Sequence, residues 1–187
     1  MTRSRRRASD PENLSPAAIS REMRRLLPLT GSWSVKLRWS PGTHRLVGGP
    51  IEVDAHAEIR FLEGGAALHY RMGPSHWLIG GDEQSREYTV LYADDRPVSR
   101  VYRMTFRAGV WRIWRNAPGF SQRFEARVQR GGRRIVGHWD RSEDNRKWVR
   151  DFDLRFVREA PGGARERSSL PRSSPGLRSV LSFQQAG

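Results

Sequence analysis

The stretch from Arg100 to Phe124, RVYRMTFRAGVWRIWRNAPGFSQRF, decides the fold of this chain. Apolar and polar residues alternate up to Gly109 and alternate again after it. A two-residue connection that ends in glycine between two such runs is a strong sign of a β-hairpin. The register set by this turn places Phe106 opposite Trp111, so that every second residue from either one shares an apolar face. The sequence therefore predicts two antiparallel strands with one buried face.

The apolar face of this hairpin carries polar groups at one end. Arg100 and Tyr102 lie on the first strand, and the register places Arg115 opposite Tyr102. In the last predicted strand, Arg150 shares the inward face with Phe152. An unpaired buried guanidinium is costly and normally has an anion or another partner. We therefore expect the three arginines and Tyr102 to lie inside the fold, where they could hold an acidic group.

Two further hairpins have the same form. Gly64-Gly65 and Gly131-Gly132 each stand between alternating runs, and glycine supplies the positive φ angles of a primed turn without steric cost. The first turn places Phe61 opposite Leu68, and the second places Phe124 opposite Trp139. Turn chemistry and hydrophobic pattern agree in both hairpins, which favours this register.

Alternation also predicts strands beginning at Trp33, Ile51, Tyr88 and Trp148. The tyrosines after position 87 share a face with Tyr102 only if the connection between them has an odd number of residues. Residues 40–50, rich in proline and glycine, read as a loop. Because no strand-helix-strand alternation occurs, the chain is predicted to be all-β: an antiparallel up-and-down lipocalin-like barrel of about nine or ten strands.

One short helix is expected before the barrel. It begins after a Ser15 cap, has apolar residues at helical spacing, and ends at Pro28. Its apolar residues are Ile19, Met23, Leu26 and Leu27. Three parts follow: a disordered basic N-terminus at residues 1–14, a barrel domain with its capping helix at 15–158, and a disordered C-terminal tail at 159–187.

The composition excludes some classes of protein. The 187 residues include no cysteine, which rules out disulfides and thiolate metal sites, and no apolar run is long enough to span a bilayer. The Arg-rich start lacks the apolar segment of a secretory signal, so we expect a cytoplasmic protein.

The net charge is +14, but only Lys36 and Lys147 of the 34 basic residues are lysine. This ratio favours compositional drift in a GC-rich genome over a surface selected for polyanions.

Two segments resemble a known group. Gly31-Ser32-Trp33 is similar to the Gly-x-Trp opening of the lipocalin and fatty-acid-binding (calycin) barrels. The run from Tyr92 to Phe156, with DDRPVSRVYRM, VWRIWRNAPGFSQRF and a closing W-x-x-DFDL-x-F, resembles a group of uncharacterised bacterial proteins with lipocalin-like barrels. The resemblance covers about residues 28–158. It implies a calycin-like fold, and it implies a structural role for Trp33 at the closed end of the barrel.

The chain is also similar to two better-known groups of calycin barrels, and their ligands imply what this barrel could hold. Fatty-acid-binding proteins hold a carboxylate with arginines and a tyrosine, including Arg-x-Tyr on the last strand; here Arg150 matches and Phe152 replaces the tyrosine. Tyr102 is then the only hydroxyl group expected near Arg115. Nitrobindin-type haem barrels have a glycine-rich strand after the tryptophan, whereas Trp33 is followed by Ser-Val-Lys. We therefore expect no cofactor, haem included.

Each candidate group also has a structural interpretation. In lipocalin-like barrels an arginine near the chain end packs over the Gly-x-Trp indole, which is a second explanation for the predicted inner arginines. Only His76 among the five histidines could reach the interior; a surface or rim position is favoured for it, and no metal site is predicted. Trp114 is expected outside, stacked by a neighbouring arginine. The pairs Asp94-Asp95 and Asp151-x-Asp153 are expected to be solvated charges rather than catalytic carboxylates.

We expect the barrel to bind a small, largely apolar ligand without covalent chemistry, with an acidic head group as an option. The residues expected to contact it are Arg100, Tyr102, Arg115, Arg150, Trp111 and Tyr70. A cavity enzyme such as a cyclase or isomerase stays open as an alternative, although a non-enzymatic role is favoured. Nucleic-acid binding through the outer arginines is the second alternative. The sequence leaves the ligand's identity and the oligomeric state open.

Overall fold

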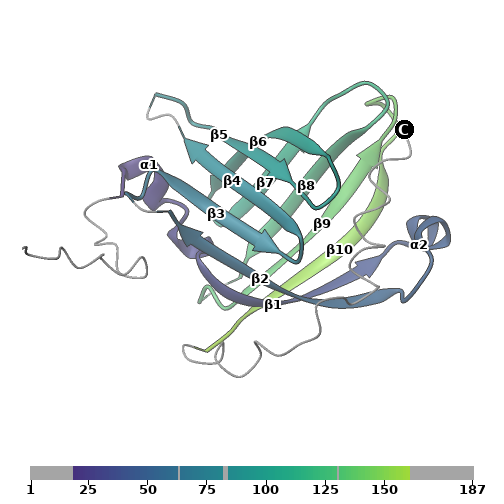
Figure 1. The fold of residues 1–187 in the computed structure, drawn as a ribbon, viewed down its shortest axis with the longest axis horizontal. Helices are drawn as coiled ribbons and strands as arrows, with labels where there is room; N and C mark the ends of the chain where they lie inside the picture. The colour runs from purple at the N-terminus through teal and green to yellow at the C-terminus, as the bar shows by residue number, and fades with distance from the viewer. Residues whose placement is uncertain (1–18, 63, 82–83, 130, 161–187) are drawn as a thin grey trace, which may run out of the picture.

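The computed structural model describes residues 19–62, 64–81, 84–129 and 131–160, and these residues form ten antiparallel strands in one closed barrel (Figure 1). Each strand pairs with its neighbour in the sequence, and β1 closes the barrel by pairing with β10. The predicted all-β, up-and-down barrel is therefore confirmed. The predictions for residues 1–14 and for the tail from 161 onward lie outside the described residues.

The strands have six to ten residues each, and two short α-helices and one 3-10 helix flank β1. The bounds are α1 Arg21–Arg24, a 3-10 helix Leu27–Leu29, β1 Gly31–Trp39, α2 Pro41–Val47, β2 Glu52–Phe61, β3 Ala67–Met72, β4 Ser75–Gly81, β5 Tyr88–Ala93, β6 Ser99–Arg107, β7 Val110–Arg115, β8 Ser121–Val128, β9 Arg134–Ser142 and β10 Val149–Arg158.

The hairpin that decides the fold forms in the predicted register. Phe106 of β6 pairs with Trp111 of β7, and the two turn residues both have positive φ, 49° at Ala108 and 72° at Gly109. This is the primed geometry that matches the twist of the flanking strands. The predicted registers of β2 with β3 and of β8 with β9 are confirmed as well.

The connection between β5 and β6 confirms the expected odd count. Ala93 pairs with Ser99, so five residues lie between the strands. Val90 consequently faces Tyr102, and the tyrosines of β5 share the inner face of β6. The first residue of this connection is Asp94, which follows directly after β5 and lies at the same end of the barrel as the candidate site.

The helix before the barrel differs in part from the prediction. α1 is a single turn, capped by the Ser20 side chain, and a 3-10 turn follows it. Met23 and Leu29 are buried as expected of a capping helix, but Leu27 is 40% exposed. The prediction of Leu27 on the apolar face is wrong because the change to 3-10 geometry at this point rotates the residue outward.

The loop predicted at residues 40–50 contains α2, so this prediction is wrong. Ser40 caps the helix with its side chain, Pro41 occupies the first turn, and Gly48 ends the helix at a φ of 70°. Proline and glycine at these positions are typical of helix ends as well as of loops. Their presence in this segment therefore does not distinguish a loop from a short helix.

A β-bulge in β10 overturns the predicted facing of two residues. The register with β9 shifts between Arg150 and Phe152, so both Asp151 and Phe152 are buried while Arg150 is exposed. The prediction that Arg150 points inward is wrong, and so is the prediction that Asp151 is a solvated charge. A bulge places two residues opposite one, which breaks the period of two on which the prediction rested.

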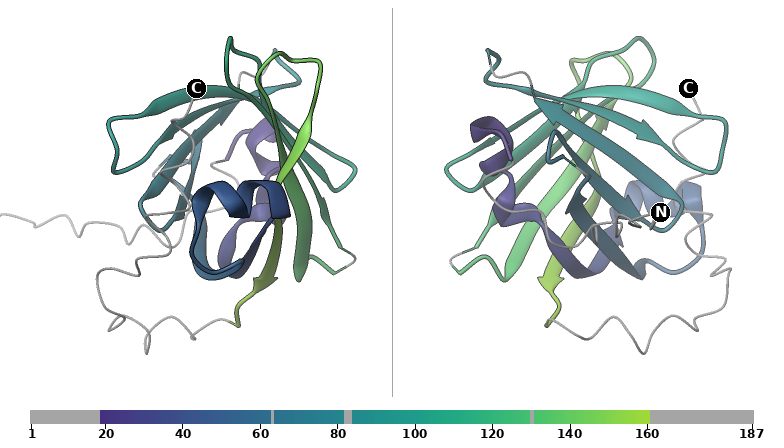
Figure 2. Two further views of the ribbon diagram at one scale, coloured as in Figure 1. Left: turned by 90° about the vertical axis from the view of Figure 1, so that its right-hand side faces the viewer. Right: turned by 60° about the vertical axis from the view of Figure 1, so that its left-hand side comes forward.

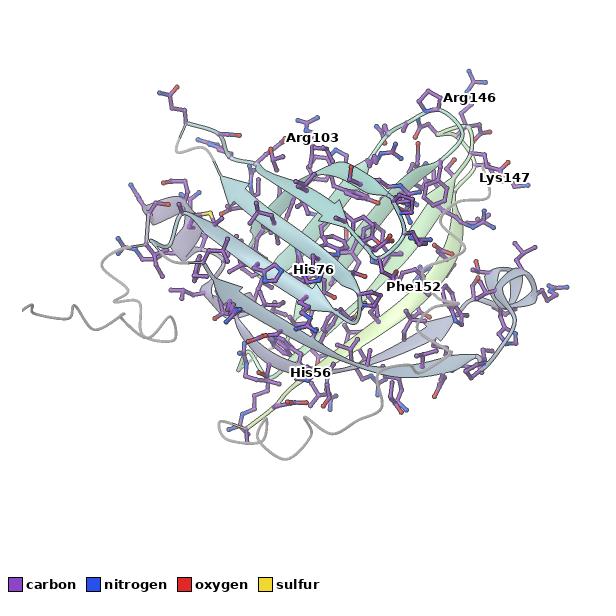
Figure 3. The ribbon with its side chains drawn as sticks, viewed as in Figure 1. His56, His76, Arg103, Arg146, Lys147 and Phe152 are labelled. Carbon is purple, nitrogen blue, oxygen red and sulfur yellow. The ribbon has the colours of Figure 1, made fainter. Side chains whose placement is uncertain are left out.

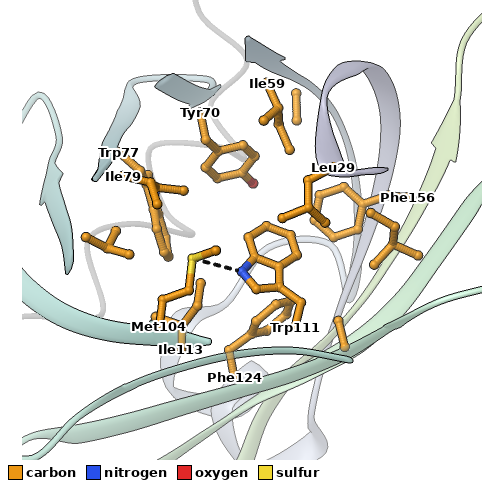
Figure 4. Packing of buried hydrophobic residues seen from close by; sticks show 14 of the residues in the cluster. Leu29, Ile59, Tyr70, Trp77, Ile79, Met104, Trp111, Ile113, Phe124 and Phe156 are labelled. Atoms are coloured by element: carbon orange, nitrogen blue, oxygen red, sulfur yellow. Dashed lines mark hydrogen bonds between the residues drawn. The ribbon is translucent and has the colours of Figure 1, made fainter. Parts of the chain in front are cut away.

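Aromatic and aliphatic side chains fill the middle of the barrel. Figure 4 shows the Trp111 ring among them, with its Nε1 donating to the Met104 sulfur at 3.3 Å. The two ends differ. We call the end beside α1 the closed end, and the end beside α2, where β7 ends and β8 begins, the polar end (Figure 2).

Candidate ligand-binding site

An internal cavity of about 50 Å³ lies between the middle of the barrel and its polar end. Nine aromatic side chains line it: Trp77, Trp111, Trp139, Tyr70, Tyr92, Tyr102, Phe124, Phe152 and Phe156. The remaining lining residues are Leu37, Met72, Ser75, Ile113 and Leu154. The predicted cavity residues Tyr70, Tyr102 and Trp111 are therefore brought together.

Trp77 is the centre of the aromatic wall. Its ring stacks on Tyr102 at 5.9 Å, and Tyr70 and Tyr92 meet it edge-on at 5.4 and 5.5 Å. Such pairs contribute about 0.5–1.5 kcal/mol each beyond the burial of their area, which favours one arrangement of the rings. Burial raises the pKa of Tyr70, and that residue therefore stays neutral.

Arg100 and Arg115 lie near each other at the polar end, as predicted. The Arg100 guanidinium lies 4.8 Å from the centre of the Phe120 ring, and Arg115 donates to the Phe120 carbonyl at 2.8 Å. Both side chains are half-buried. The turn from Ala117 to Phe120 therefore contacts both cations at the polar end.

The Tyr102 hydroxyl group joins the cavity to this end. It donates to Oε1 of Gln122 at 2.7 Å. Burial raises the pKa of Tyr102, while the charge of Arg100, a hydrogen bond from Arg100 and the charge of Arg115 act in the opposite direction. Tyr102 is thus a neutral hydroxyl group between an aromatic wall and two cations.

Three neighbouring strands place one polar residue each in a row across the polar end. Arg115 of β7 pairs with Gln122 of β8, and Gln122 pairs with Arg141 of β9. We call Arg115, Gln122 and Arg141 the Gln122 row. Gln122 and Arg141 each lie two residues nearer the polar end than Phe124 and Trp139, which pair with each other and line the cavity. The three residues of the row do not line the cavity themselves, so the row lies at the polar end just beyond it.

A second polar group at this end was not expected. Asp94, predicted to be a solvated turn residue, has no exposed side-chain surface; it accepts from the Tyr92 hydroxyl at 2.6 Å and pairs with Arg96. Burial alone would raise the pKa of Asp94, but the hydrogen bonds from Arg96 and Tyr92 outweigh burial and lower it. The prediction for Asp94 is wrong because the five-residue connection turns its carboxylate back toward the barrel.

Arg150 is outside this site. Its guanidinium contacts Asp140 at 3.0 Å and Asp153 at 2.7 Å on the outer face, and Asp140 also contacts Arg123 at 2.9 Å. This arrangement is an outer network of alternating charges. Arg150 therefore has a structural explanation and is not part of the candidate site.

Trp33 has the structural role that the resemblance implied. It is fully buried, donates from Nε1 to the Leu29 carbonyl at 3.0 Å, and is covered by the Arg158 guanidinium at 4.1 Å from its ring. An arginine near the chain end does pack over the Gly-x-Trp indole, but it is Arg158 and not one of the three arginines predicted inside. Packing over the Trp33 ring therefore does not explain Arg100 and Arg115, which lie at the polar end.

The favoured surface position of His76 is confirmed. His76 is exposed on the outer face of β4, where its Nδ1 lies 3.0 Å from Nε2 of His69 (Figure 3). Burial and the neighbouring His76 lower the pKa of His69. The described residues contain no group of three or more His, Cys, Asp or Glu side chains placed to hold a metal ion.

Sequence reasoning missed Gln122 and Arg141, although a signal was present. Gln122 precedes Phe124 by two residues, and Arg141 follows Trp139 by two, so simple alternation places both inside the barrel. Arg141 was instead assigned to a polar loop. The residue pattern gave no sign that Asp151 is buried, because its burial depends on the β-bulge in β10.

None of the helices in the described part of the chain has the length and apolar character that a membrane span requires.

Comparisons with known proteins find similar solved structures but no family. No family model matches the chain, and no curated protein matches it. Among the solved structures that match is the crystal structure of Rv2717c from M. tuberculosis, with 11% sequence identity and a TM-score of 0.47. The match covers 76% of this chain and 99% of that one.

Proposed function

We propose that the barrel binds a small, largely apolar molecule, without covalent chemistry, in its internal cavity. One observation carries the proposal: nine aromatic rings surround a space that is not filled by side chains, next to a polar barrel end. Ligand sites in proteins are typically concave, mostly apolar and flanked by a few placed polar groups. A calycin-like relationship, which the sequence resemblance implies, is part of the same proposal.

The volume of the cavity limits the ligand. A cavity of about 150 Å³ accommodates benzene in an engineered protein. The cavity here is about one third of that size, at about 50 Å³. An apolar part of a few carbon atoms fits the space without moving a ring. Tyr102 and Arg115 lie where a polar head group of such a molecule would leave the aromatic wall.

A series of straight-chain alcohols from ethanol to octanol tests the proposal. Binding is followed by NMR through the indole N–H signals of Trp77, Trp111 and Trp139. We expect these signals to shift more than that of Trp33, and we expect the affinity to rise and then fall as the chain outgrows the cavity. If no alcohol shifts the three cavity signals, the proposal fails.

A matched pair of variants ties the result to the cavity. Ile113→Val removes one methylene group from the cavity wall, and Ile135→Val removes the same group from a buried site that does not line the cavity. Each change costs about 0.5–1.5 kcal/mol of stability, which a folded domain tolerates. We expect only Ile113→Val to move the best-bound alcohol to a longer chain.

The two alternatives gain no specific support from the described residues. Trp114, the outer aromatic residue that suggested base stacking, lies under Arg103 at 5.4 Å. The Asp94 carboxylate is held by Arg96 and has a lowered pKa, which does not suit a general base at neutral pH. Binding without turnover is therefore the function that we propose.

A further inference from the structure

Three buried donors at the polar end have no hydrogen-bond partner among the described residues: Nη1 of Arg96, Nε2 of Gln122 and Nε of Arg141. The last two belong to residues that pair directly across β8 and β9. A buried donor without an acceptor loses its hydration and gains nothing in return. Two such donors side by side indicate that an acceptor belongs at this place.

The Tyr102 hydroxyl fixes the direction of the Gln122 amide. The phenol oxygen takes a hydrogen bond from Arg100, and the phenol proton goes to Oε1 of Gln122 at 2.7 Å. The amide oxygen therefore faces Tyr102, and the NH₂ group points away from it. Because the Gln122 side chain has no exposed surface, bulk water does not satisfy these N–H groups.

Two guanidinium groups border the Gln122 donor: Arg115 flanks Gln122 on one side and Arg141 flanks it on the other. The nearest carboxylates of Arg141 are those of Asp151, whose Oδ1 lies 3.8 Å from Nε, and of Glu143, whose Oε1 lies 3.9 Å from Nη1. Both distances are beyond hydrogen-bonding distance, so neither carboxylate is the acceptor of the Nε donor. Asp151 itself accepts from the Thr43 hydroxyl at 3.0 Å, and burial raises its pKa. The acceptor that suits this place is therefore an anion.

We infer that the Gln122 row binds the carboxylate of a short monocarboxylic acid, whose alkyl part enters the aromatic cavity past Tyr102. The inference rests on the proposed function and names the class of its ligand. One oxygen of the carboxylate accepts from Gln122 Nε2 and the other from Arg141 Nε. A planar group with two acceptor oxygens matches two neighbouring donors, and the cavity of about 50 Å³ takes an alkyl tail of a few carbons.

Butanoate and butan-1-ol form the test pair, because they share a tail and differ in the head group. Both are titrated into the full-length chain at pH 7, with the indole N–H signals of the cavity tryptophans as the readout. We expect butanoate to bind at least about tenfold more tightly than the alcohol. Gln122→Leu and Arg141→Met should each remove most of this preference and leave the affinity for butan-1-ol within about twofold.

Arg155→Gln is the control for charge. Arg155 is exposed on the outer face of β10, so its replacement removes one positive charge from the chain without touching the row. We expect it to leave the preference for butanoate unchanged. If Arg155→Gln lowers the preference as much as Arg141→Met does, general electrostatic attraction explains the binding and the inference is overturned.

The remaining outcomes separate the inference from the function on which it rests. If butan-1-ol binds and butanoate binds no more tightly, the row does not recognise carboxylates, while the cavity does bind ligands. If neither compound shifts the cavity tryptophans, the proposed function fails with it. Inorganic phosphate is titrated as well, and binding as tight as that of butanoate would overturn the assignment to a carboxylate. Should one variant not fold, the other decides the result.

Discussion

The closed end and the polar end of the barrel are built on the same ten described strands but in opposite ways. At the closed end, Met23, Leu29 and Trp33 are fully buried, and the polar groups among them have partners. Trp33 donates to a carbonyl, and Arg158 donates to three. At the polar end, Gln122 is buried and Arg141 is half-buried, and one buried donor atom of each has no hydrogen-bond partner in the described residues.

This difference separates stability from binding. Apolar burial with satisfied hydrogen bonds stabilises the fold, whereas buried donors without acceptors lower its stability. Natural proteins retain such groups mainly where they serve function. The closed end therefore holds the barrel together, and the polar end is the place where a ligand would add the missing contacts. Four substitutions test this division, from the largest expected effect to the smallest.

Trp33→Ala should have the largest effect, because Trp33 is the largest fully buried side chain of the closed end. We expect the free energy of unfolding to fall by about 3–5 kcal/mol, measured by urea denaturation. Trp114→Ala removes the same side chain from the outer face, where it is half-buried, and should cost less than about 1 kcal/mol. Equal losses in the two variants would contradict a closed end that carries most of the stability.

Arg158→Met should cost about 2–3 kcal/mol. The arginine covers the Trp33 ring and donates to the carbonyls of Pro28, Thr30 and Gly132, so its loss leaves three carbonyls without that donor. The matched change at the polar end is Arg100→Met, which also removes an arginine from an aromatic ring. We expect thermal unfolding to show a clearly larger loss for Arg158→Met, and the reverse order would break the comparison.

Gly137→Ala should cost about 1–3 kcal/mol, because β8 and β9 approach each other closely at this point. A Cβ atom at Gly137 would overlap the Ala126 side chain and lie 2.5 Å from the Glu125 carbonyl oxygen. Gly80→Ala is the control, since a Cβ atom there meets nothing within 4 Å. Comparable denaturation midpoints for the two variants would show that the strands move apart easily.

Asp151→Asn should have the smallest effect and the opposite sign. Burial raises the pKa of Asp151, so the folded state resists its ionisation. The charged carboxylate therefore lowers stability above the folded-state pKa, and this penalty fades as the pH falls toward the value of an unfolded aspartate, about 3.9. We expect a gain of less than about 1 kcal/mol at pH 7 that disappears at low pH.

The control for this pH dependence is Asp153→Asn. Asp153 is exposed and contacts Arg150 at 2.7 Å, so its replacement removes a favourable contact. It should give no gain at any pH. A gain in Asp151→Asn that persisted below the unfolded-state pKa would contradict an origin in buried charge.

Much of the fold could be predicted because local signals were sufficient. Gly109 and the paired glycines at 64–65 and 131–132 fix three turns, and each turn fixes the register of its two strands. The same alternation placed Tyr102 and Arg115 together at one end. It also contained the information for Gln122 and Arg141, which continue the inward face beyond Phe124 and Trp139.

The candidate site could be predicted only in part, because its other features depend on contacts between distant segments. Asp151 is buried because a bulge in β10 brings it to Thr43 of α2, more than 100 residues earlier. Asp94 is buried because its loop folds back onto Tyr92. The closing arginine is Arg158, since pairing of β1 with β10 brings it over Trp33.

The sequence by itself determined an antiparallel barrel, its hairpin registers and an inner face rich in aromatic residues with arginines at one end. These properties follow from the period of two in a strand and from the φ angles that glycine permits, both of which act within a few residues. The tertiary structure alone decided how much space the aromatic rings leave and which arginines face it. It also decided which buried donors lack an acceptor. Those properties arise where strands far apart in the sequence close upon one another, because packing and hydrogen bonding are settled only when all partners are in place.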